Sequence, residues 1–387
     1  MLIVYENKPG GVSVYNQNLI KYLLKENFEF EVLEYNYVEN YKTTIKKNGK
    51  TFKALFSIYS SRYEILNSVK KIFSKQELII CNDFFELTVI YFFKLQCKVV
   101  FILHGDLPHY RSILNAKSGI IDCVFCVSNS LMKHYSRLYE NLIFYCTPPL
   151  TDDFDLAIQI NYYEPLKIVY AGRFVSLKGA DILNKVSKLL LEKLNVEITC
   201  YLPVEANEGI LIKEIPERVQ VIYGLSNRTI LEEFKKFDLL LFPSRSEGFG
   251  IVVVECLKRG IVPFVLNTAL GPKDMVIHSE TGFSFLEDEF VKEAFELIEL
   301  LNFDRSRLAV IKNTASNFAN KFFSFDGLGK TFITSVNQAV QITKNKSFTK
   351  MEFTMLENII PPFIYKFLKY WRKKISKYRR QDGILVK

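Results

Sequence analysis

Short apolar segments alternate with helical patterns along most of the chain, and this alternation constrains the fold more than any other feature. Helical patterns such as SVYNQNLIKYLLKEN and HYRSILNA separate these segments. Alternation of this kind predicts a parallel sheet covered by helices, which is an α/β fold. In the first 150 residues the expected strands are LIVYE, FEFEVLEY, ELIICND, KVVFILHG, DCVFCVS and NLIFYC.

A second alternation begins near residue 166, after the aperiodic segment TPPLTDDFDLAIQINYYEP with its three prolines. Its expected strands are LKIVYAGR, NVEITCYLP, VQVIYGL, DLLLFPS and VPFVL. A chain of 387 residues is too long for most single cores. We therefore predict two Rossmann-like domains, residues 1–150 and 166–343, with a linker at 151–165 and a closing helix near 325–343.

Residues 344–387 form a tail of different character. The stretch 361–380 has eight Lys or Arg and no acid, which leaves the rest of the chain near +1 of the formal +9. As a helix it would gather an apolar stripe about 100° wide, with lysines opposite, as in helices that lie on anionic membranes. The alternative is a terminal helix packed on the protein. We favour membrane contact.

Other features bear on the compartment. The start MLIVYENKPGG has no basic leader, and seven scattered cysteines favour a reducing cytoplasm. The most apolar long window, FELTVIYFFKLQCKVVFILH, is broken by charges and reads as helix then strand, not as a membrane span. We expect a cytoplasmic protein, peripheral on the inner face of the cell membrane.

Cys123 and Cys126 form a C-x-x-C without a second pair or a nearby histidine cluster. In the expected strand DCVFCVS, side chains at this odd spacing point to opposite faces. Zinc sites normally need about four ligands. We expect no metal at this pair.

Two short segments have features of phosphate sites. In NKPGGVSVYNQNL, Gly10 and Gly11 open an expected helix and let a phosphate or sugar approach its N-terminus, although the G-x-G-x-x-G fingerprint is missing. In YAGRFVSLKGADIL, Arg173 and Lys178 follow a strand, where two cations can clamp a diphosphate. The alternatives are a tight strand–helix turn and two solvated cations.

The stretch FPSRSEGFGIVVVECLKRG places Glu247 and Glu255 eight positions apart. Four β-branched residues make its helix ambiguous. As a helix, it would separate the two carboxylates by about 12 Å along the axis. That separation suits two ends of one ligand better than a shared metal, and the helix N-terminus between them could bind a phosphate.

Together these segments resemble the retaining glycosyltransferases of family 4, also called glycosyltransferase group 1, which have the GT-B fold. The resemblance covers about residues 1–343. It implies two domains that face a central cleft. It rests on PGGVSVYNQNLIKYL, AGRFVSLKG, LFPSRSEGFGIVVVECLKRGIVPFV and LGPKDMVIHSETGFSF.

The resemblance also implies residue roles. Arg173 and Lys178 would bind the diphosphate of a nucleotide-sugar donor, and Glu255 would hydrogen-bond its ribose. Glu247 would contact the transferred sugar, near the backbone amides of Gly248, Phe249 and Gly250.

Across the cleft, His104 would lie near the transferred sugar, with His109 as the fallback, and Gly10 with Gly11 would line the acceptor and phosphate side. Asp274 stands where relatives often have Glu, so its contact to the donor is expected to be shorter or different. No metal or other cofactor is implied. We interpret the D-x-D of Asp153 and Asp155 as solvated because it lies in the linker.

The expected activity is hexosyl transfer with retention, from a nucleotide-diphosphate sugar to a glycan or lipid-linked acceptor in bacterial surface polysaccharide or lipopolysaccharide synthesis. The departing phosphate would help deprotonate the acceptor hydroxyl. Alternatives are a soluble or protein acceptor, nucleic-acid binding through the tail, and a scaffold without activity. The near-neutral remainder of the chain argues against nucleic acid.

Overall fold

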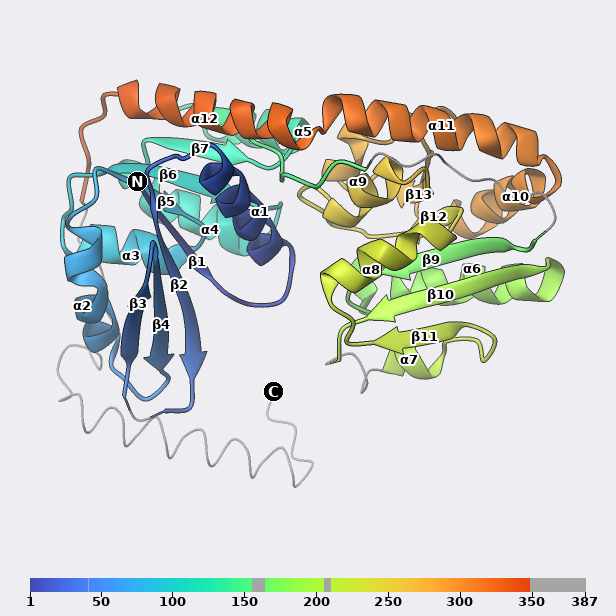
Figure 1. The fold of residues 1–387 in the computed structure, drawn as a ribbon, viewed down its shortest axis with the longest axis horizontal. Coiled ribbons are helices and arrows are strands. Elements are labelled where there is room, and N and C mark those ends of the chain that lie inside the picture. The colour runs from blue at the N-terminus through green and yellow to red at the C-terminus, as the bar shows by residue number, and fades with distance from the viewer. Residues whose placement is uncertain (41, 155–163, 205–209, 349–387) are drawn as a thin grey trace.

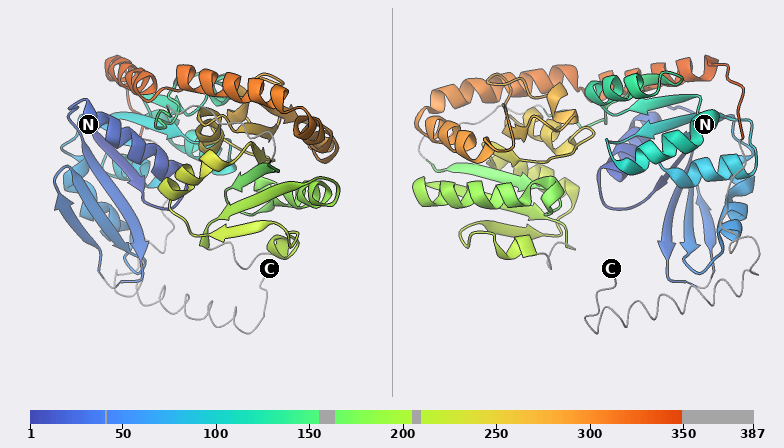
Figure 2. Two further views of the ribbon diagram at one scale, coloured as in Figure 1. Left: turned by 45° about the vertical axis from the view of Figure 1, so that its right-hand side comes forward. Right: turned by 180° about the vertical axis from the view of Figure 1, so that it is seen from behind.

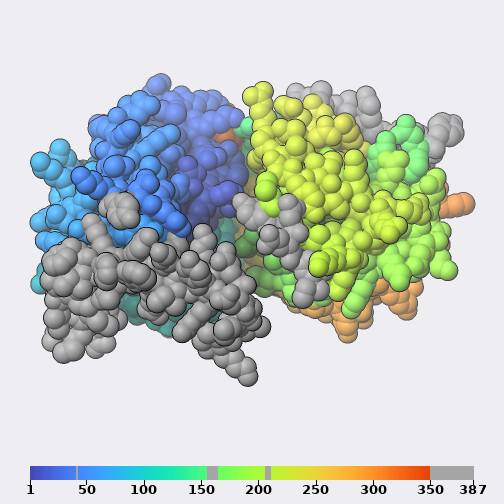
Figure 3. All heavy atoms as spheres, turned by 90° about the horizontal axis from the view of Figure 1, so that it is seen from below, coloured from blue at the N-terminus to red at the C-terminus, as the bar shows by residue number. Residues whose placement is uncertain are grey.

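The computed structural model describes residues 1–40, 42–154, 164–204 and 210–348. They form two α/β domains that lie side by side (Figures 1 and 2), each built on a largely parallel sheet with helices on its faces. The space-filling view shows the same division, with a blue N-terminal half beside a yellow-green C-terminal half (Figure 3). The two-domain Rossmann-like architecture predicted from the sequence is confirmed. The basic stretch 361–380 lies outside the described residues.

The N-terminal domain has an eight-stranded sheet in the order β3-β4-β2-β1-β5-β6-β7-β8. Its neighbouring strands are parallel except for the antiparallel pair β3–β4. The strands are β1 (Leu2–Glu6), β2 (Glu31–Val38), β3 (Thr44–Asn48), β4 (Thr51–Ser57), β5 (Leu78–Cys81), β6 (Lys98–Leu103), β7 (Cys123–Cys126) and β8 (Ile143–Cys146).

Helices connect these strands, and two of them begin with capping boxes. Ser61 and Glu64 form the capping box of α2, and Asp83 and Glu86 form that of α3. These capping boxes fix where the two helices begin. The helices are α1 (Gly11–Lys25), α2 (Arg62–Phe73), α3 (Phe84–Phe92), α4 (Pro108–Lys117), the short η1 (Ser118–Ile120) and α5 (Asn129–Leu138).

The C-terminal domain has a six-stranded parallel sheet in the order β11-β10-β9-β12-β13-β14. The strands are β9 (Leu166–Ala171), β10 (Val196–Leu202), β11 (Gln220–Tyr223), β12 (Leu239–Phe242), β13 (Val262–Leu266) and β14 (Phe283–Phe285). The helices are η2 (Ser176–Lys178), α6 (Ala180–Lys193), α7 (Ile210–Lys213), α8 (Asn227–Glu233), η4 (Phe234–Lys236), α9 (Ile251–Lys258), η5 (Gly271–Asp274), α10 (Phe290–Phe303) and α11 (Arg305–Phe322).

The ambiguous segment IVVVECLKR is helix α9. Val253 and Val254 are fully buried in the core, so packing outweighs the modest helix propensity of β-branched residues. Gly250 caps the helix with φ 87°, a left-handed conformation that favours glycine. Glu255 therefore lies in the second turn of a buried helix.

The last helix, α12 (Phe325–Gln341), returns to the N-terminal domain (Figure 1), although the sequence grouped it with the C-terminal one. Its Phe332 packs edge-on against Phe125 of β7, with ring centroids 5.7 Å apart. Beyond it, Lys346 donates to Asp122 at 2.7 Å. These tail-proximal residues are thus part of the N-terminal domain.

A second expectation, that Asp153 in the linker is solvated, is wrong. Its carboxylate has partners within the protein. The buried Lys258 ammonium donates to the Asp153 carboxylate at 2.9 Å and to the Thr151 carbonyl at 2.8 Å. The same carboxylate accepts the backbone N–H of Phe325 at 3.0 Å. A buried ammonium needs such acceptors. Asp155 lies outside the described residues.

In the part of the chain that the structure describes, no helix is long and apolar enough to cross a membrane. The window FELTVIYFFKLQCKVVFILH is helix α3 followed by strand β6, as predicted. Cys123 and Cys126 are buried in β7 with free thiols. Over the same described ranges, no three His, Cys, Asp or Glu side chains gather as a metal site.

Candidate functional site

The two domains touch where the loops after β6 and β12 meet. A Cβ added to Gly248 would overlap the carbonyl oxygen of His104 and would lie 2.8 Å from the Cα of Gly105. Only glycine fits this approach, and the loop that bears Glu247 is thereby held against the loop that bears His104. The carboxyl ends of strands in an open α/β sheet are where ligands usually bind.

Lys178 and Glu247 meet directly at this place. The Lys178 ammonium donates to Glu247 Oε1 at 2.7 Å and to the Ser246 carbonyl at 3.1 Å. Both side chains are mostly buried, with 17% and 14% of their surfaces exposed. The two residues that the sequence assigned to one ligand therefore form an ion pair. Arg173 lies just after β9 with its side chain exposed.

Two helix N-termini converge beside this pair. Helix α1 begins at Gly11 after Gly10, whose φ is 143°, and α9 begins at Ile251. A Cβ on Gly11 would lie only 3.8 Å from the Ile251 side chain, so the first residues of the two helices are neighbours. The first turn of a helix generally leaves backbone N–H groups without intrahelical partners and carries the positive end of the helix dipole, so two neighbouring N-termini favour an anion between them.

The Phe249 side chain belongs to the core and not to the cleft. It is 3% exposed and packs edge-on against Phe323, with ring centroids 5.8 Å apart. A Cβ on Gly271 would overlap the Phe249 backbone, so this loop is tightly enclosed. The buried ring fixes the backbone of Gly248–Gly250 at the start of α9.

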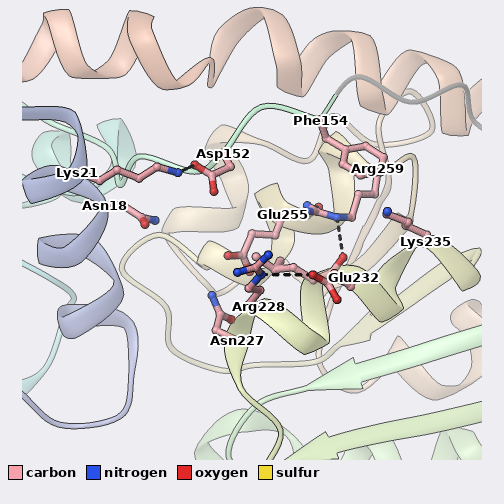
Figure 4. Close-up of a pocket in the computed structure, with 11 residues that line it drawn as sticks. Asn18, Lys21, Asp152, Phe154, Asn227, Arg228, Glu232, Lys235, Glu255 and Arg259 are labelled. Carbon is pink, nitrogen blue, oxygen red and sulfur yellow. Dashed lines mark hydrogen bonds and ion pairs between the residues drawn. The ribbon is translucent and has the colours of Figure 1, made fainter. Parts of the chain in front are cut away.

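Glu255 forms part of the wall of a pocket in the cleft (Figure 4) with a volume of about 540 Å³. Burial is the main cause that raises the pKa of Glu255 to about 7, opposed by Arg259 and by a hydrogen bond from Asn227. Asn18 and Lys21 of α1 face it from the other domain. The remaining lining residues are Asp152, Phe154, Arg228, Leu231, Glu232 and Lys235.

His104 lies in a buried polar network of the N-terminal domain. Its Nε2 is 2.6 Å from Asn82 Oδ1, and Tyr15 packs edge-on against its ring at 5.2 Å. Burial lowers the pKa of His104 to about 3, so the ring is neutral near pH 7. His109, the fallback, is exposed and lies 3.4 Å from Asp83, outside this network.

Asp274 joins the two domains. Its carboxylate accepts the Ser130 hydroxyl at 2.6 Å and the Ser130 backbone N–H at 3.2 Å, at the N-terminus of α5. The sequence suggested a shorter or altered donor contact at this position. In the structure the carboxylate binds a helix N-terminus of the opposite domain, and its contact to the donor stays a prediction.

One charged residue of the site was missed by the sequence reading. Arg245, two residues before Glu247, forms a bidentate pair with Asp181 and a further ion pair with Glu287. The only sign of this role in the sequence is the presence of an arginine inside the loop PSRSEGFG. Its partners could not be inferred because Asp181 and Glu287 are far from Arg245 in the chain.

Comparison with known proteins finds a family model that is similar to part of the C-terminal half. Residues 153–317 match the family model described as Glycosyl transferases group 1. An uncharacterized glycosyltransferase of Haemophilus influenzae is 28% identical over 35% of this chain and 38% of its own length. An uncharacterized protein in the cps region of Klebsiella pneumoniae is 28% identical over 47% of each chain. These alignments span less than half of either relative.

An uncharacterized glycosyltransferase of Methanocaldococcus jannaschii matches more of the chain, at 24% identity over 82% of this protein and 92% of its own length. The pneumococcal O-GlcNAc transferase GtfA in complex with UDP and GlcNAc superposes with a TM-score of 0.70 at 10% identity. The superposition covers 88% of this chain and 99% of the GtfA chain. Anabaena HepE in complex with UDP-glucose superposes with a TM-score of 0.67 at 17% identity. The superposition covers 87% of this chain and 100% of the HepE chain. These structural likenesses show the GT-B fold that the sequence predicted.

Proposed function

We propose that this protein is a retaining glycosyltransferase that uses a nucleotide-diphosphate sugar. The observation that carries the proposal is the contact between Lys178 and Glu247, 2.7 Å apart, beside two converging helix N-termini. A mutually neutralised cation and carboxylate next to an anion-binding site suit a ligand with a diphosphate and a sugar. The match of residues 153–317 to group 1 glycosyltransferases agrees with this chemistry.

The donor diphosphate would lie between the cations Arg173 and Lys178 and the N-termini of α1 and α9. Phosphate would draw the Lys178 ammonium away from Glu247, whose carboxylate is then free to accept hydroxyl groups of the sugar. Glu255, in the wall of the neighbouring pocket, would hydrogen-bond the ribose hydroxyls. Charge-assisted hydrogen bonds of this kind hold the donor and stabilise the charge that grows on it.

Transfer would break the bond between the anomeric carbon and the phosphate oxygen, and the electron pair would stay on the phosphate. That oxygen would take the proton of the acceptor hydroxyl as the hydroxyl attacks from the same face of the sugar, so the anomeric configuration is retained. Lys178 and Arg173 would stabilise the departing diphosphate. Neutral His104, held by Asn82, would present an uncharged imidazole near the sugar.

The acceptor would be a glycan or lipid-linked glycan of a bacterial surface polysaccharide or lipopolysaccharide. The Klebsiella relative in a cps region points to this class. The basic stretch 361–380 would hold the enzyme on an anionic membrane. Deletion from residue 361 should abolish binding to vesicles that contain anionic lipid. Unchanged vesicle binding would favour a soluble or protein acceptor, and salt-sensitive binding to nucleic acid without lipid would favour the nucleic-acid alternative.

The donor site is tested first with the ligand-free protein. One nucleoside diphosphate or its sugar should raise the melting temperature, because it binds only the native state. With that donor, Glu247→Ala and Lys178→Ala should abolish transfer and stay folded, whereas Glu299→Ala on the exposed face of α10 should not change it. Near-normal turnover in either site variant would refute the assignment. NMR of the product anomer tests retention.

A further inference from the structure

Arg245 pairs with two carboxylates and a backbone carbonyl of the protein itself. Its Nη1 and Nη2 donate to the two carboxylate oxygens of Asp181, each at 2.8 Å. Its Nε and Nη2 approach Glu287 Oε1 at 2.8 and 2.7 Å, and Nη1 also donates to the Ser176 carbonyl. Nε, Nη1 and Nη2 of the guanidinium therefore each donate to an acceptor within the protein. Arg173, in contrast, has an exposed side chain.

These contacts join two loops that carry candidate site residues. Ser176 and Asp181 flank Lys178, whereas Arg245 lies in the loop of Glu247. The backbone N–H of Arg245 also donates to the Leu177 carbonyl at 3.0 Å. Arg245 thus holds the loop of Lys178 from both sides.

The two loops also pack backbone against backbone. Gly179 has φ 73°, and a Cβ there would overlap the Pro243 carbonyl and lie 2.9 Å from the proline ring. The Lys178 ammonium, in turn, donates to the Ser246 carbonyl at 3.1 Å. These contacts join the two loops through both backbone and side chains.

We propose that Arg245 is a positioning residue, which sets where the Lys178 ammonium stands relative to Glu247 without itself touching the donor. This inference rests on the proposed function. Loosening the Arg245–Asp181 pair should let the η2 loop move away, so that Lys178 no longer meets the diphosphate in the right place.

Asp181 offers a variant that separates position from charge. Asp181→Asn removes a negative charge near the diphosphate, so a purely electrostatic effect would make nucleotide binding tighter. The same change weakens the bidentate pair with Arg245, so a positional effect makes binding weaker. The two explanations therefore predict opposite signs for one measurement.

The experiment measures the dissociation constant of uridine 5′-diphosphate by calorimetry, or that of GDP or ADP if the thermal-shift screen selects one of these. Arg245→Lys and Asp181→Asn should each raise it about tenfold, the loss expected for one charged hydrogen bond. The control Arg307→Ala, on the exposed face of α11, should leave it within about twofold of wild type. Melting curves establish that each variant is folded.

A double-mutant cycle identifies the route of the effect. If Arg245 acts through Lys178, Asp181→Asn should cause no further loss in a Lys178→Ala background, because the ammonium to be placed is already absent. Loss of the same size in both backgrounds would overturn the inference, as would equal or tighter binding by Asp181→Asn alone. If the wild type binds no nucleoside diphosphate and no nucleotide sugar in the thermal-shift screen, the proposed function fails and this inference fails with it.

Discussion

Replacement of Gly248 by alanine probes the contact between the two domains. The added Cβ would lie 2.8 Å from the Cα of Gly105 and would overlap the carbonyl oxygen of His104. Carbon atoms in contact lie about 3.5–4.0 Å apart, so the two loops must separate by about 1 Å. Gly248 does not have a left-handed φ, so alanine adds no backbone strain within its own domain.

We expect Gly248→Ala to fold normally and to lose activity. A misplacement of about 1 Å in an active site costs about 100-fold in rate, which is about 2.7 kcal/mol in the barrier. Nucleotide affinity should change much less, because the proposed donor contacts lie mainly in the C-terminal domain. The loss should therefore appear in kcat, measured with the donor that the thermal-shift screen identifies.

Gly105→Ala is the matched control from the opposite side of the same contact. Its Cβ would lie 3.6 Å from the Gly248 nitrogen, an ordinary van der Waals distance. This variant should keep most of the activity. Near-normal kcat in Gly248→Ala, or equal losses in both variants, would refute the argument that close approach of these two loops is required for transfer.

Two further predictions concern buried charges. Burial raises the pKa of Glu255 from 4.5 to about 7, so the native state keeps a proton that the unfolded chain releases, and stability falls as pH rises through this range. Glu255→Gln should therefore raise the unfolding free energy by about 1–3 kcal/mol at pH 8 but not at pH 4. The same change should weaken nucleotide binding. Equal unfolding free energies of the wild type and Glu255→Gln at pH 8 would contradict this prediction. Lys258→Met removes the donor to Thr151 and Asp153 and should lower the unfolding free energy by about 1–3 kcal/mol in urea titrations. Lys330→Met on the exposed face of α12 is its control, and equal effects of the two changes would refute a special role for Lys258.

Most of the fold could be predicted because buried parallel strands have nearly continuous apolar sequences. The β3–β4 hairpin was missed since Thr44–Asn48 is mostly exposed and carries few apolar residues, although Asn48-Gly49 is a strong turn signal. Helix α9 stayed ambiguous because propensity and packing disagree there, and only tertiary burial decides between them.

The candidate site was predicted in part, for a similar reason. Lys178 and Glu247 could be assigned to one ligand from their motifs, and the structure brings them into contact. The roles of Arg245 and Asp274 could not be predicted, because each depends on partners far away in the sequence. Asp153 was wrongly expected to be solvated because nothing in the sequence of α9 shows that Lys258 is buried and pairs with it.

The return of α12 to the N-terminal domain has a consequence for how the protein is made. Domains usually fold in the order in which they leave the ribosome, at about 5–20 residues per second. Here the N-terminal sheet lacks the helix that covers Phe125 until residues 325–341 have been synthesised. The C-terminal domain, whose strands and helices end at Phe322, can complete its core earlier. The first domain to be translated is therefore the last to be finished, and nascent chains stalled before α12 should expose its unfinished face to chaperones.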